Sequence, residues 1–592
     1  MEVIDMKKIL CYTRKPLDEA IYAPKLAYSM HLAYETPEGF APLNHNSGVL
    51  FVKATQNPET LQLYPKSLKK PCLCALPEGG YAVAAIRVEA NGEPDESSKG
   101  CVVVFRSDDL LNYTELGLIK LCDEHIEDIS LHFCKNCDHL VIKYKIGESI
   151  TRVMLNTLTE PSNDVRPCEK LNIPETETDI EGAEPRNFVE VPDELFCHLK
   201  KKLLTPVNTD ITLDKTKVAS VDELLAVGAT AHYSDGSCAR KRIDWCVPEN
   251  LTSGTYKIKG KIHQDHFEFP LAINRADPCV YRYNGAYYFI ATNDADGNHS
   301  ISVRKADSIP ELKDAEEHLI LDSVTYPHVG GLLWAPEFHE VGGKLYIFHA
   351  CTPKEFGDEE SHVTAYNYSG DLTEKSSWEM PIKVQKPDGS PLYTVGITLD
   401  MTTFESGGDT YAVWSQRQFN PCDLGAWLYI AKLDQKEPWK LTTEPVLLSM
   451  PELGWQNNHT LVDEGPFALI HDGKIYLTFS SALVDSTYCV GMFTADLDSD
   501  LLDISNWHKT GYPLLSSASV EGEYGPGHNA YCIDEYGDIW NTYHARPGVN
   551  GPRSSGIRRV HIGFDGEPVL DMTEEKDVCP ALREVEITLE LK

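Results

Sequence analysis

Five short segments in the C-terminal half of the chain share one pattern of polar and apolar positions. Each has a glycine, two further residues, a Tyr or Trp, and then an apolar stretch. The segments are NGAYYFIAT (284–292), GGKLYIFHA (342–350), GGDTYAVWS (407–415), DGKIYLTFS (472–480) and YGDIWNTYH (536–544). Glycine supplies the positive φ of tight hairpin turns, and the aromatic-rich run is typical of a returning strand. The pattern therefore predicts five β-hairpins.

The hairpins recur at a nearly constant spacing. Their glycines, at positions 285, 343, 408, 473 and 537, are 58, 65, 65 and 64 residues apart. A four-stranded propeller blade with long loops has this size, and a fixed period indicates radial repetition. A generic β-sandwich does not require an aromatic residue three positions after glycine five times over. We therefore expect a five-bladed β-propeller over residues 273–592.

The rest of the chain also has strand-like patterns. Residues 196–272 resemble a bacterial Ig-like module, with YSDGS (233–237), Trp245 and SGTY (253–256) in the expected order. In residues 1–195, LPEGGYAVAAIRV (76–88) followed by GCVVVFRSDDLLNY (100–113) echoes the propeller hairpins. We expect an all-β protein with three domains: an N-terminal β-rich domain of blade-like sheets at 1–195, a small Ig-like β-sandwich at 196–272, and the propeller.

Charge and composition limit the partners. The 592 residues include 54 basic and 90 acidic side chains, a formal net charge of −36, which argues against nucleic acid or an anionic membrane surface. An uncharged ligand is compatible, and a homo-oligomer is left open. The first residues, MEVIDMKKILCYTRKP, lack a secretory apolar stretch, and the 17 cysteines follow no disulfide framework. These observations predict a cytoplasmic location.

Polar residues precede the hairpins at similar distances. Asp277 and Asp400 lie eight residues before their hairpin glycine, Glu464 and His528 nine residues before, and Glu337 six. Because the innermost strand of each blade lines the propeller axis, residues at equivalent positions converge at one end of the channel. Strand entries are often polar loops in any protein. That explanation does not account for the flanking DP, GP and GPG, which fix the backbone where a side chain must be aimed.

Three carboxylates in one pocket indicate cleavage of a glycosidic bond. This reaction needs a general acid to protonate the leaving oxygen and a second carboxylate on the opposite face of the sugar. Neighbouring carboxylates raise the pKa of the acid, so that it can hold a proton near neutral pH.

From about residue 270 to 592 the chain resembles glycoside hydrolase family 43. The resemblance rests on RADPCVYRYNGAYYFIAT, GGLLWAPEFHEVGGKLYIF, LDMTTFESGGDTYAVWS, DEGPFALIHDGKIYLTFS, GPGHNAYCIDEYGDIWNTYHARP and RRVHIGFDGEPV. It implies a five-bladed propeller with Asp277 as general base, Glu464 as general acid and Asp400 as the carboxylate that tunes and orients the acid. It also implies inversion of configuration, with the base and acid carboxyls about 6.5–9.5 Å apart.

Three further residues are candidates for substrate binding. Trp334 could be a platform for a sugar ring or a packing residue of the blade, and Arg546 could donate to sugar hydroxyls or pair with the carboxylates. The resemblance places His528 on the axis, near a structural calcium ion or a water cluster, although a single histidine is a poor calcium signature. No cofactor is required by this chemistry.

The resulting hypothesis is an inverting, exo-acting α-L-arabinofuranosidase, or a bifunctional arabinofuranosidase/β-xylosidase, acting on arabino-oligosaccharides from plant cell wall. Alternatives are a β-xylosidase or exo-β-galactosidase of the same family, or a non-catalytic glycan-binding propeller. Asp463 and Glu464 are adjacent, and neighbouring side chains on a strand point opposite ways. We therefore expect Asp463 to point away from the axis and to hydrogen-bond nearby backbone.

Overall fold

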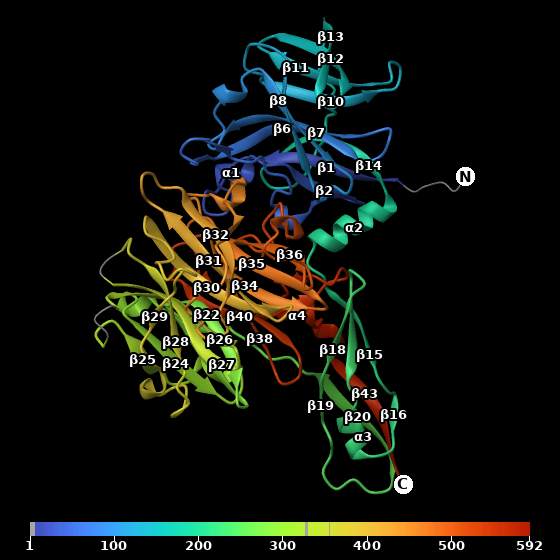
Figure 1. Ribbon diagram of the computed structural model, residues 1–592. Helices are drawn as coiled ribbons and strands as arrows, with labels where there is room; N and C mark the ends of the chain where they lie inside the picture. The colour runs from blue at the N-terminus through green and yellow to red at the C-terminus, as the bar shows by residue number, and fades with distance from the viewer. Residues whose placement is uncertain (1–5, 326–328, 354–355) are drawn as a thin grey trace.

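The computed structural model of the protein describes residues 6–325, 329–353 and 356–592, and it is built almost entirely of β-sheets (Figure 1). The helices of this described part are short: α1 (Pro24–Ala27), α2 (Asp193–Leu203), α3 (Val221–Leu225) and α4 (Glu574–Asp577). None of the helices in these ranges is long and apolar enough to cross a lipid bilayer.

Five four-stranded sheets form the predicted β-propeller. Blade 1 contains β22 (Arg275–Tyr283), β23 (Ala286–Asn293), β24 (Ser300–Ala306) and β25 (His318–Asp322). Blade 2 contains β26 (Gly331–Val341), β27 (Lys344–Thr352), β28 (Glu360–Ala365) and β29 (Ile382–Lys383). Blade 3 contains β30 (Gly396–Ser406), β31 (Asp409–Gln418), β32 (Gly425–Leu433) and β33 (Val446–Ser449).

Blade 4 contains β34 (Asp463–His471), β35 (Lys474–Ser481), β36 (Cys489–Asp496) and β37 (His508–Lys509). Blade 5 contains β38 (Tyr524–Ile533), β39 (Ile539–Arg546), β40 (Ser554–Arg559) and β21 (Ala272–Ile273). Each predicted hairpin joins the first two strands of a blade, and its glycine has a φ between 75° and 86°. The five predicted hairpins are therefore confirmed.

The first strand of every blade lies at the centre of the ring. β22, β26, β30, β34 and β38 contact one another in this order, and β38 contacts β22 again. The ring is closed by β21, which precedes blade 1 in sequence but pairs with β40 of blade 5, with Ala272 opposite Ser555 and Ile273 opposite Ser554. Closure therefore joins the two ends of the propeller segment through backbone hydrogen bonds.

The N-terminal region contains the expected blade-like sheets. One sheet has the order β14 (Ala183–Pro192), β1 (Met6–Arg14), β2 (His31–Thr36) and β3 (Gly39–Pro42). Two more run in chain order: β6 (Lys66–Ala75), β7 (Tyr81–Glu89), β8 (Cys101–Ser107) and β9 (Thr114–Lys120), then β10 (Asp128–Cys134), β11 (His139–Ile146), β12 (Ser149–Thr157) and β13 (Glu160–Pro167). The short strands β4 (Thr55–Gln56) and β5 (Leu63–Tyr64) pair with each other.

The N-terminal sheets pack onto blades 3 and 4. One continuous apolar cluster contains Ile9 and Phe51 from the N-terminal region together with Val413, Trp455 and Phe479 from the propeller. Figure 1 shows the N-terminal strands above the blades that carry β32, β35 and β36. Because burial of apolar area is the main stabilising contribution to such contacts, this region and the propeller share one core.

The segment between the N-terminal region and the propeller forms two small sheets. One has β15 (Asn208–Leu213), β17 (Ala229–Tyr233) and β18 (Cys238–Lys241), and the other has β16 (Lys217–Val218), β43 (Glu584–Leu591), β20 (Gly254–Ile262) and β19 (Ile243–Trp245). β43 is the last strand of the chain, and in Figure 1 its red ribbon lies among green strands. The division at residues 195 and 272 stays a prediction, but the structure adds that residues 584–591 belong to this small sheet.

We predict that Leu589→Ala loosens the small sheet from its C-terminal strand. Leu589 is fully buried, and its strand position pairs with Tyr256 on β20 and Val218 on β16. Loss of a buried leucine side chain costs about 2–5 kcal/mol. Native-state hydrogen exchange on peptide 254–262 should show faster exchange. The half-buried Leu591 offers the control, since Leu591→Ala should cost much less. Unchanged protection of β20 in Leu589→Ala would contradict the assignment.

Candidate active site

The innermost strand of every blade breaks its pairing register at the same place. The breaks fall between Ala276 and Cys279, Trp334 and Glu337, Leu399 and Thr402, and Glu464 and Phe467, and in β38 between Gly527 and Ala530; β26 and β38 each have a second break earlier in the strand. At each break one residue has a φ of 46° to 54°: Asp277, Ala335, Asp400, Gly465 and His528. Such bulges bend a strand and re-aim side chains. The repeat thus brings Asp277, Asp400 and His528 to one end of the channel.

Two of the candidate residues, Glu337 and Glu464, do not lie at the break of their strand. In blade 2 the residue at the break is Ala335, whereas the buried Glu337 lies two residues further and its carboxylate is 2.7 Å from His339 Nε2. In blade 4 the residue at the break is Gly465, and Glu464 precedes it by one position. A Cβ on Gly465 would lie 3.0 Å from the His528 ring, so the glycine leaves space for this imidazole.

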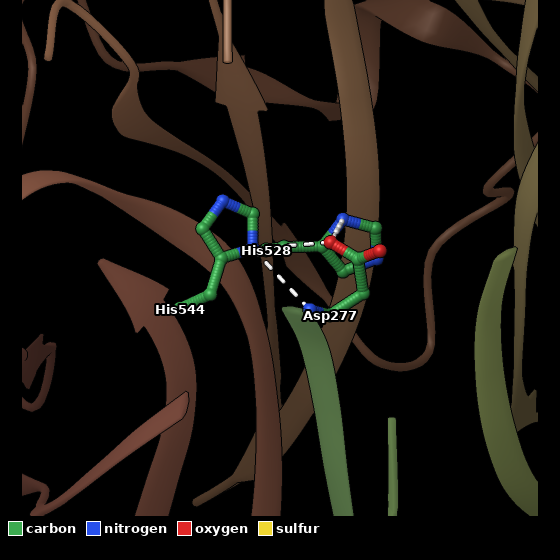
Figure 2. Close-up of side chains that lie close together, drawn as sticks. All are labelled: Asp277, His528 and His544. Carbon is green, nitrogen blue, oxygen red and sulfur yellow. Dashed lines mark hydrogen bonds and ion pairs between the residues drawn. The ribbon is translucent and has the colours of Figure 1, made fainter. Parts of the chain in front are cut away.

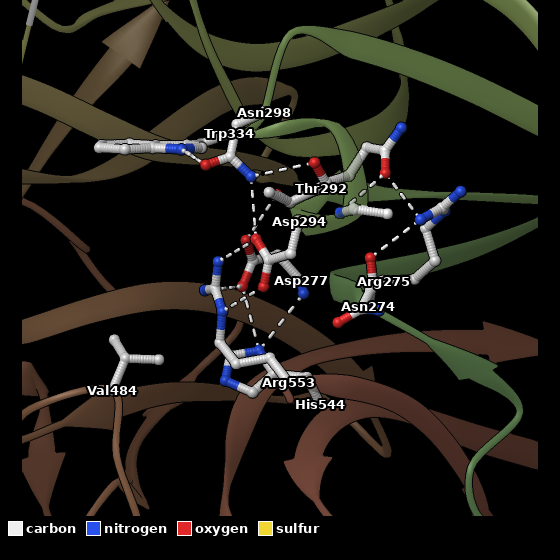
Figure 3. Close-up of polar contacts among 12 residues, drawn as sticks. Asn274, Arg275, Asp277, Thr292, Asp294, Asn298, Trp334, Val484, His544 and Arg553 are labelled. Atoms are coloured by element: carbon white, nitrogen blue, oxygen red, sulfur yellow. Dashed lines mark hydrogen bonds and ion pairs between the residues drawn. The ribbon is translucent and has the colours of Figure 1, made fainter. Parts of the chain in front are cut away.

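Asp277 is a buried carboxylate surrounded by donors (Figures 2 and 3). Its Oδ2 accepts a hydrogen bond from Thr292 Oγ1 at 2.5 Å. Its Oδ1 lies 3.0 Å from His544 Nδ1, 3.2 Å from His528 Nδ1 and 3.4 Å from Arg553 Nη1. Burial alone would raise the pKa of Asp277, but His528, Arg553 and His544 together hold that pKa well below its usual value. Asp277 is therefore kept ionised.

The pKa values of Asp400 and Glu464 are raised, in contrast to that of Asp277. Burial raises the pKa of Asp400 well above its usual value, and the charges of Glu464 and Asp277 add to this against the effect of His528. Asp400 Oδ2 accepts from the Gly465 N–H at 3.1 Å. Burial also raises the pKa of Glu464, although the hydroxyl of Tyr488, which donates to Glu464 Oε1 at 2.8 Å, opposes the shift. The site thus holds one ionised carboxylate and two that retain protons more readily.

Asp463 and Glu464 face different surroundings. The half-buried Glu464 lines the cavity, whereas Asp463 is fully buried on the other side of β34. The Asp463 carboxylate accepts hydrogen bonds from the side chains of Ser449, Gln456 and Ser481. The expected alternation of the two side chains is present, but the partners of Asp463 are side chains rather than backbone groups.

A cavity of about 300 Å³ opens between these carboxylates and an aromatic wall. Its lining includes Asp277, Asp400, Glu464, His528 and Trp334, so the structure brings these sequence-predicted residues together. The indole Nε1 of Trp334 donates to Asn298 Oδ1 at 3.1 Å, as Figure 3 shows, which fixes the orientation of the ring. The remaining lining residues include Phe356, Ile397, Leu399, Arg417 and Phe419.

The structure separates Arg546 from the carboxylates and places Arg553 among them. Arg546 donates to the carbonyl oxygens of Gly551 and Val484, each at 2.6 Å, and is not among the described residues that line the cavity. Arg553 instead contacts Asp277 and pairs with both carboxylate oxygens of Asp294, at 2.9 and 2.7 Å. Sequence reasoning missed Arg553 and Tyr488, because neither lies on an innermost strand. The preceding turn residues NGP (550–552) were the only local signal near Arg553.

The residues around His528 do not form an oxygen cage of the kind that Ca²⁺ prefers. Asp277, His528 and His544 bring one carboxylate oxygen and two ring nitrogens within 4.8 Å of one another. Ca²⁺ usually takes about six to eight oxygen ligands. The cationic Arg553 already contacts the same carboxylate, and His528 Nε2 is the one ring nitrogen of His528 left without a hydrogen-bond partner among the described residues. This donor set does not fit Ca²⁺, and we derive no step through a metal.

A five-bladed propeller with opposed carboxylates in an axial pocket defines the class of protein as a glycoside hydrolase. The model of the family described as "Glycosyl hydrolases family 43" matches residues 270–568, which is half of the chain, and the chain belongs to this family.

Among the curated relatives is an "Extracellular exo-alpha-(1->5)-L-arabinofuranosidase" of Streptomyces avermitilis, 32% identical over 53% of this chain and 65% of the relative. A protein of the same name from Streptomyces chartreusis is 34% identical over 47% of this chain and 82% of the relative. "Alpha-L-arabinofuranosidase B" of Pyricularia oryzae is 32% identical over 50% of this chain and 61% of the relative. The chain thus spans less than two thirds of the length of the first and third of these relatives.

Among solved structures, the α-L-arabinofuranosidase from Lactobacillus brevis is 28% identical, with a TM-score of 0.46, over 51% of this chain and 95% of that one. The expected cytoplasmic location is contradicted, because both Streptomyces relatives are named extracellular enzymes. The expectation rested on cysteine content and on the first residues of the sequence, and neither determines whether a chain is exported.

The pKa values of the two histidines beside Asp277 should be shifted in opposite directions. Burial lowers the pKa of His544 to about 4, whereas for His528 the carboxylates of Asp277, Asp400, Glu337 and Glu464 outweigh burial and raise the pKa. Histidine-selective NMR, assigned with His544→Asn, should therefore show one buried imidazole that stays neutral down to about pH 5 and one that takes up its proton at a higher pH than an unperturbed histidine. Two coincident titrations near pH 6.5 would contradict this electrostatic description.

Proposed function

We propose that the protein is an inverting, exo-acting α-L-arabinofuranosidase that releases terminal arabinofuranose from arabino-oligosaccharides. The observation that carries the proposal is that Asp277, Asp400 and Glu464 line one cavity, where the surroundings hold the pKa of Asp277 well below its usual value and raise that of Glu464. One group is thus suited to act as a base and the other as an acid at the same pH. The arabinofuranosidase names of the relatives support the choice of sugar.

In this mechanism Asp277 removes a proton from the attacking water while Glu464 protonates the glycosidic oxygen. The hydrogen bond from Thr292 and the contact with Arg553 fix the Asp277 carboxylate, and the hydroxyl of Tyr488 fixes that of Glu464. Asp400 supports Glu464 indirectly, because its carboxylate accepts a hydrogen bond from the Gly465 N–H, which belongs to the residue directly after Glu464. The proposed separation of acid and base is about 6.5–9.5 Å, which leaves room for a water.

The shape of the cavity supports exo action on one sugar unit. The buried Asp277 and Asp400 line this cavity, and its volume of about 300 Å³ suits a single furanose ring better than an extended chain. Trp334 can contact the apolar face of that ring, and His528 and Arg553 can donate to its hydroxyls. Arg546 is not assigned to sugar binding, since its guanidinium bonds backbone carbonyls.

Glu464→Gln should lower kcat by an amount that depends on the leaving group of the substrate. On natural arabino-oligosaccharides, which need protonation, we expect kcat to fall by about 10²–10⁴-fold, and on aryl arabinofuranosides with acidic leaving groups much less. Asp277→Asn should impair both, because the attacking water loses its base. Full activity of Glu464→Gln on the oligosaccharide would show that the acid is another group.

A substrate panel read by ¹H NMR tests the sugar and the stereochemistry together. We expect release of arabinose from α-L-arabinofuranosides, with the inverted anomer formed first. Preference for β-xylosides or β-galactosides would change the sugar and keep the chemistry, whereas retention of configuration would overturn the roles of Asp277 and Glu464. Binding without turnover on the whole panel would favour a glycan-binding propeller.

Arg553→Met should move the whole pH profile of kcat/KM to higher pH. The Arg553 cation lowers the pKa of Asp277 and also that of Glu464. Without it both values rise, so the acid limb, which requires ionised Asp277, and the basic limb, which requires protonated Glu464, shift upward. Arg553→Lys keeps a positive charge and should shift the limbs less. An unchanged profile in a folded Arg553→Met protein would contradict this role.

A further inference from the structure

The backbone on both sides of Glu464 is held by hydrogen bonds from neighbouring segments. Before it, the Asp463 carbonyl accepts from Ser415 Oγ at 2.9 Å, and the Asp463 carboxylate accepts from Gln456 Nε2 at 2.8 and 3.0 Å. After it, the Gly465 N–H donates to Asp400. Among the residues that the structure describes, the side chain of Glu464 has one hydrogen-bond partner, the hydroxyl of Tyr488. The direction of the acid is therefore set mainly by its backbone.

Asp463 is the better anchored of the two adjacent carboxylates. It is fully buried, and Ser449 Oγ at 2.6 Å and Ser481 Oγ at 2.7 Å also donate to it. Lys509 Nζ lies 3.6 Å from Asp463 Oδ2 and donates to Ser449 Oγ at 2.8 Å. A buried carboxylate is expensive unless it is hydrogen-bonded or paired. The cluster of Asp463, Ser449, Gln456, Ser481 and Lys509, which we call the Asp463 cluster, meets that requirement.

The N-terminal region holds the segment that supplies Gln456. Residues 450–457 are the first part of the connection between blade 3 and blade 4, which runs from 450 to 462, and the Lys25 ammonium donates to the Asn457 carbonyl. The Ala54 N–H donates to the Glu452 carbonyl at 2.6 Å, and the backbone of Lys53 pairs with that of Leu453 in an antiparallel β-bridge. Leu453 and Trp455 lie in the apolar cluster shared with the N-terminal sheets.

From this chain of contacts we propose that Gln456 and Asp463 are positioning residues for Glu464, and that the N-terminal region keeps them in place through residues 450–457. The inference rests on the proposed role of Glu464 as the acid. A displacement of about 1 Å at a reacting group can cost about 10²-fold in rate. Residues 1–195 thus contribute to catalysis without contacting substrate.

Gln456→Met tests the proposal, because it keeps the length of the side chain and removes the donor. We expect kcat on an arabino-oligosaccharide to fall at least about tenfold more than kcat on a 2,4-dinitrophenyl arabinofuranoside, which does not need the acid. Asp463→Asn should show the same selectivity. Gln435→Met is the matched control, since Gln435 Nε2 binds the Gly408 carbonyl far from the Asp463 cluster, and it should leave both rates unchanged.

Lys25→Met tests the N-terminal link separately and keeps the proposal falsifiable if the Gln456 variant folds poorly. It should reproduce the leaving-group selectivity in weaker form. Its control is Lys143→Met. The Lys143 ammonium donates to the Lys170 carbonyl and to Asn172 on the surface of the N-terminal region.

Equal losses on both substrates in folded Gln456→Met and Lys25→Met would overturn the positioning role, because they would reflect only the amount of active protein. This outcome differs from failure of the proposed function. If the latter is wrong, the wild-type protein hydrolyses neither substrate, or Glu464→Gln shows no leaving-group dependence. Wild-type activity with a selective Glu464→Gln defect and unselective Gln456→Met would reject the further inference alone.

Discussion

The active site depends on keeping one buried carboxylate ionised. Asp277 is 5% exposed, and a charge in such a place is expensive unless donors and cations surround it. Thr292 comes from the same blade, but His528, His544 and Arg553 come from blade 5. Asp277 therefore lies at the junction of the first and last blades. Arg553 directly precedes Ser554, which pairs with Ile273 of the closing strand β21, so a residue that helps to ionise Asp277 is the sequence neighbour of one that closes the ring.

A second constraint is the left-handed residue at the break of every innermost strand. It is occupied by Asp277, Asp400 and His528 where a side chain enters the site, by Ala335 in blade 2, and by Gly465 in blade 4. Gly465 uses its N–H to bind Asp400 and its missing Cβ to admit the His528 ring. Glu464, the proposed acid, is displaced by one residue in blade 4 because the position at the break is already used in this way.

Much of the propeller and the three carboxylates could be predicted from the sequence, because a repeated hairpin sets a phase along the chain. The glycines and aromatic residues show that phase directly, and Asp277 and Asp400 lie at the same distance from their glycines. Ala335 could not be recognised, since alanine gives no chemical signal. Arg553 and Tyr488 follow irregular segments that have no fixed phase. The pairing of β43 with β20 joins residues more than 300 positions apart, and no local pattern reports it.

The matched family segment, residues 270–568, includes every carboxylate of the site, yet the contacts that fix one of them extend beyond it. Asp463 does not face the cavity, but it precedes Glu464 in the chain. Its carboxylate accepts a hydrogen bond from Gln456 in the 450–457 segment, and Lys25 and Ala54 of the N-terminal region donate hydrogen bonds to that segment. A buried network of this kind is stable only when every member has its partners. In the proposed mechanism, loss of the N-terminal contacts would leave the cavity and its aromatic wall in place while Glu464 loses its fixed direction, so that the N-terminal sheets would act as part of the catalytic unit rather than as an appended module.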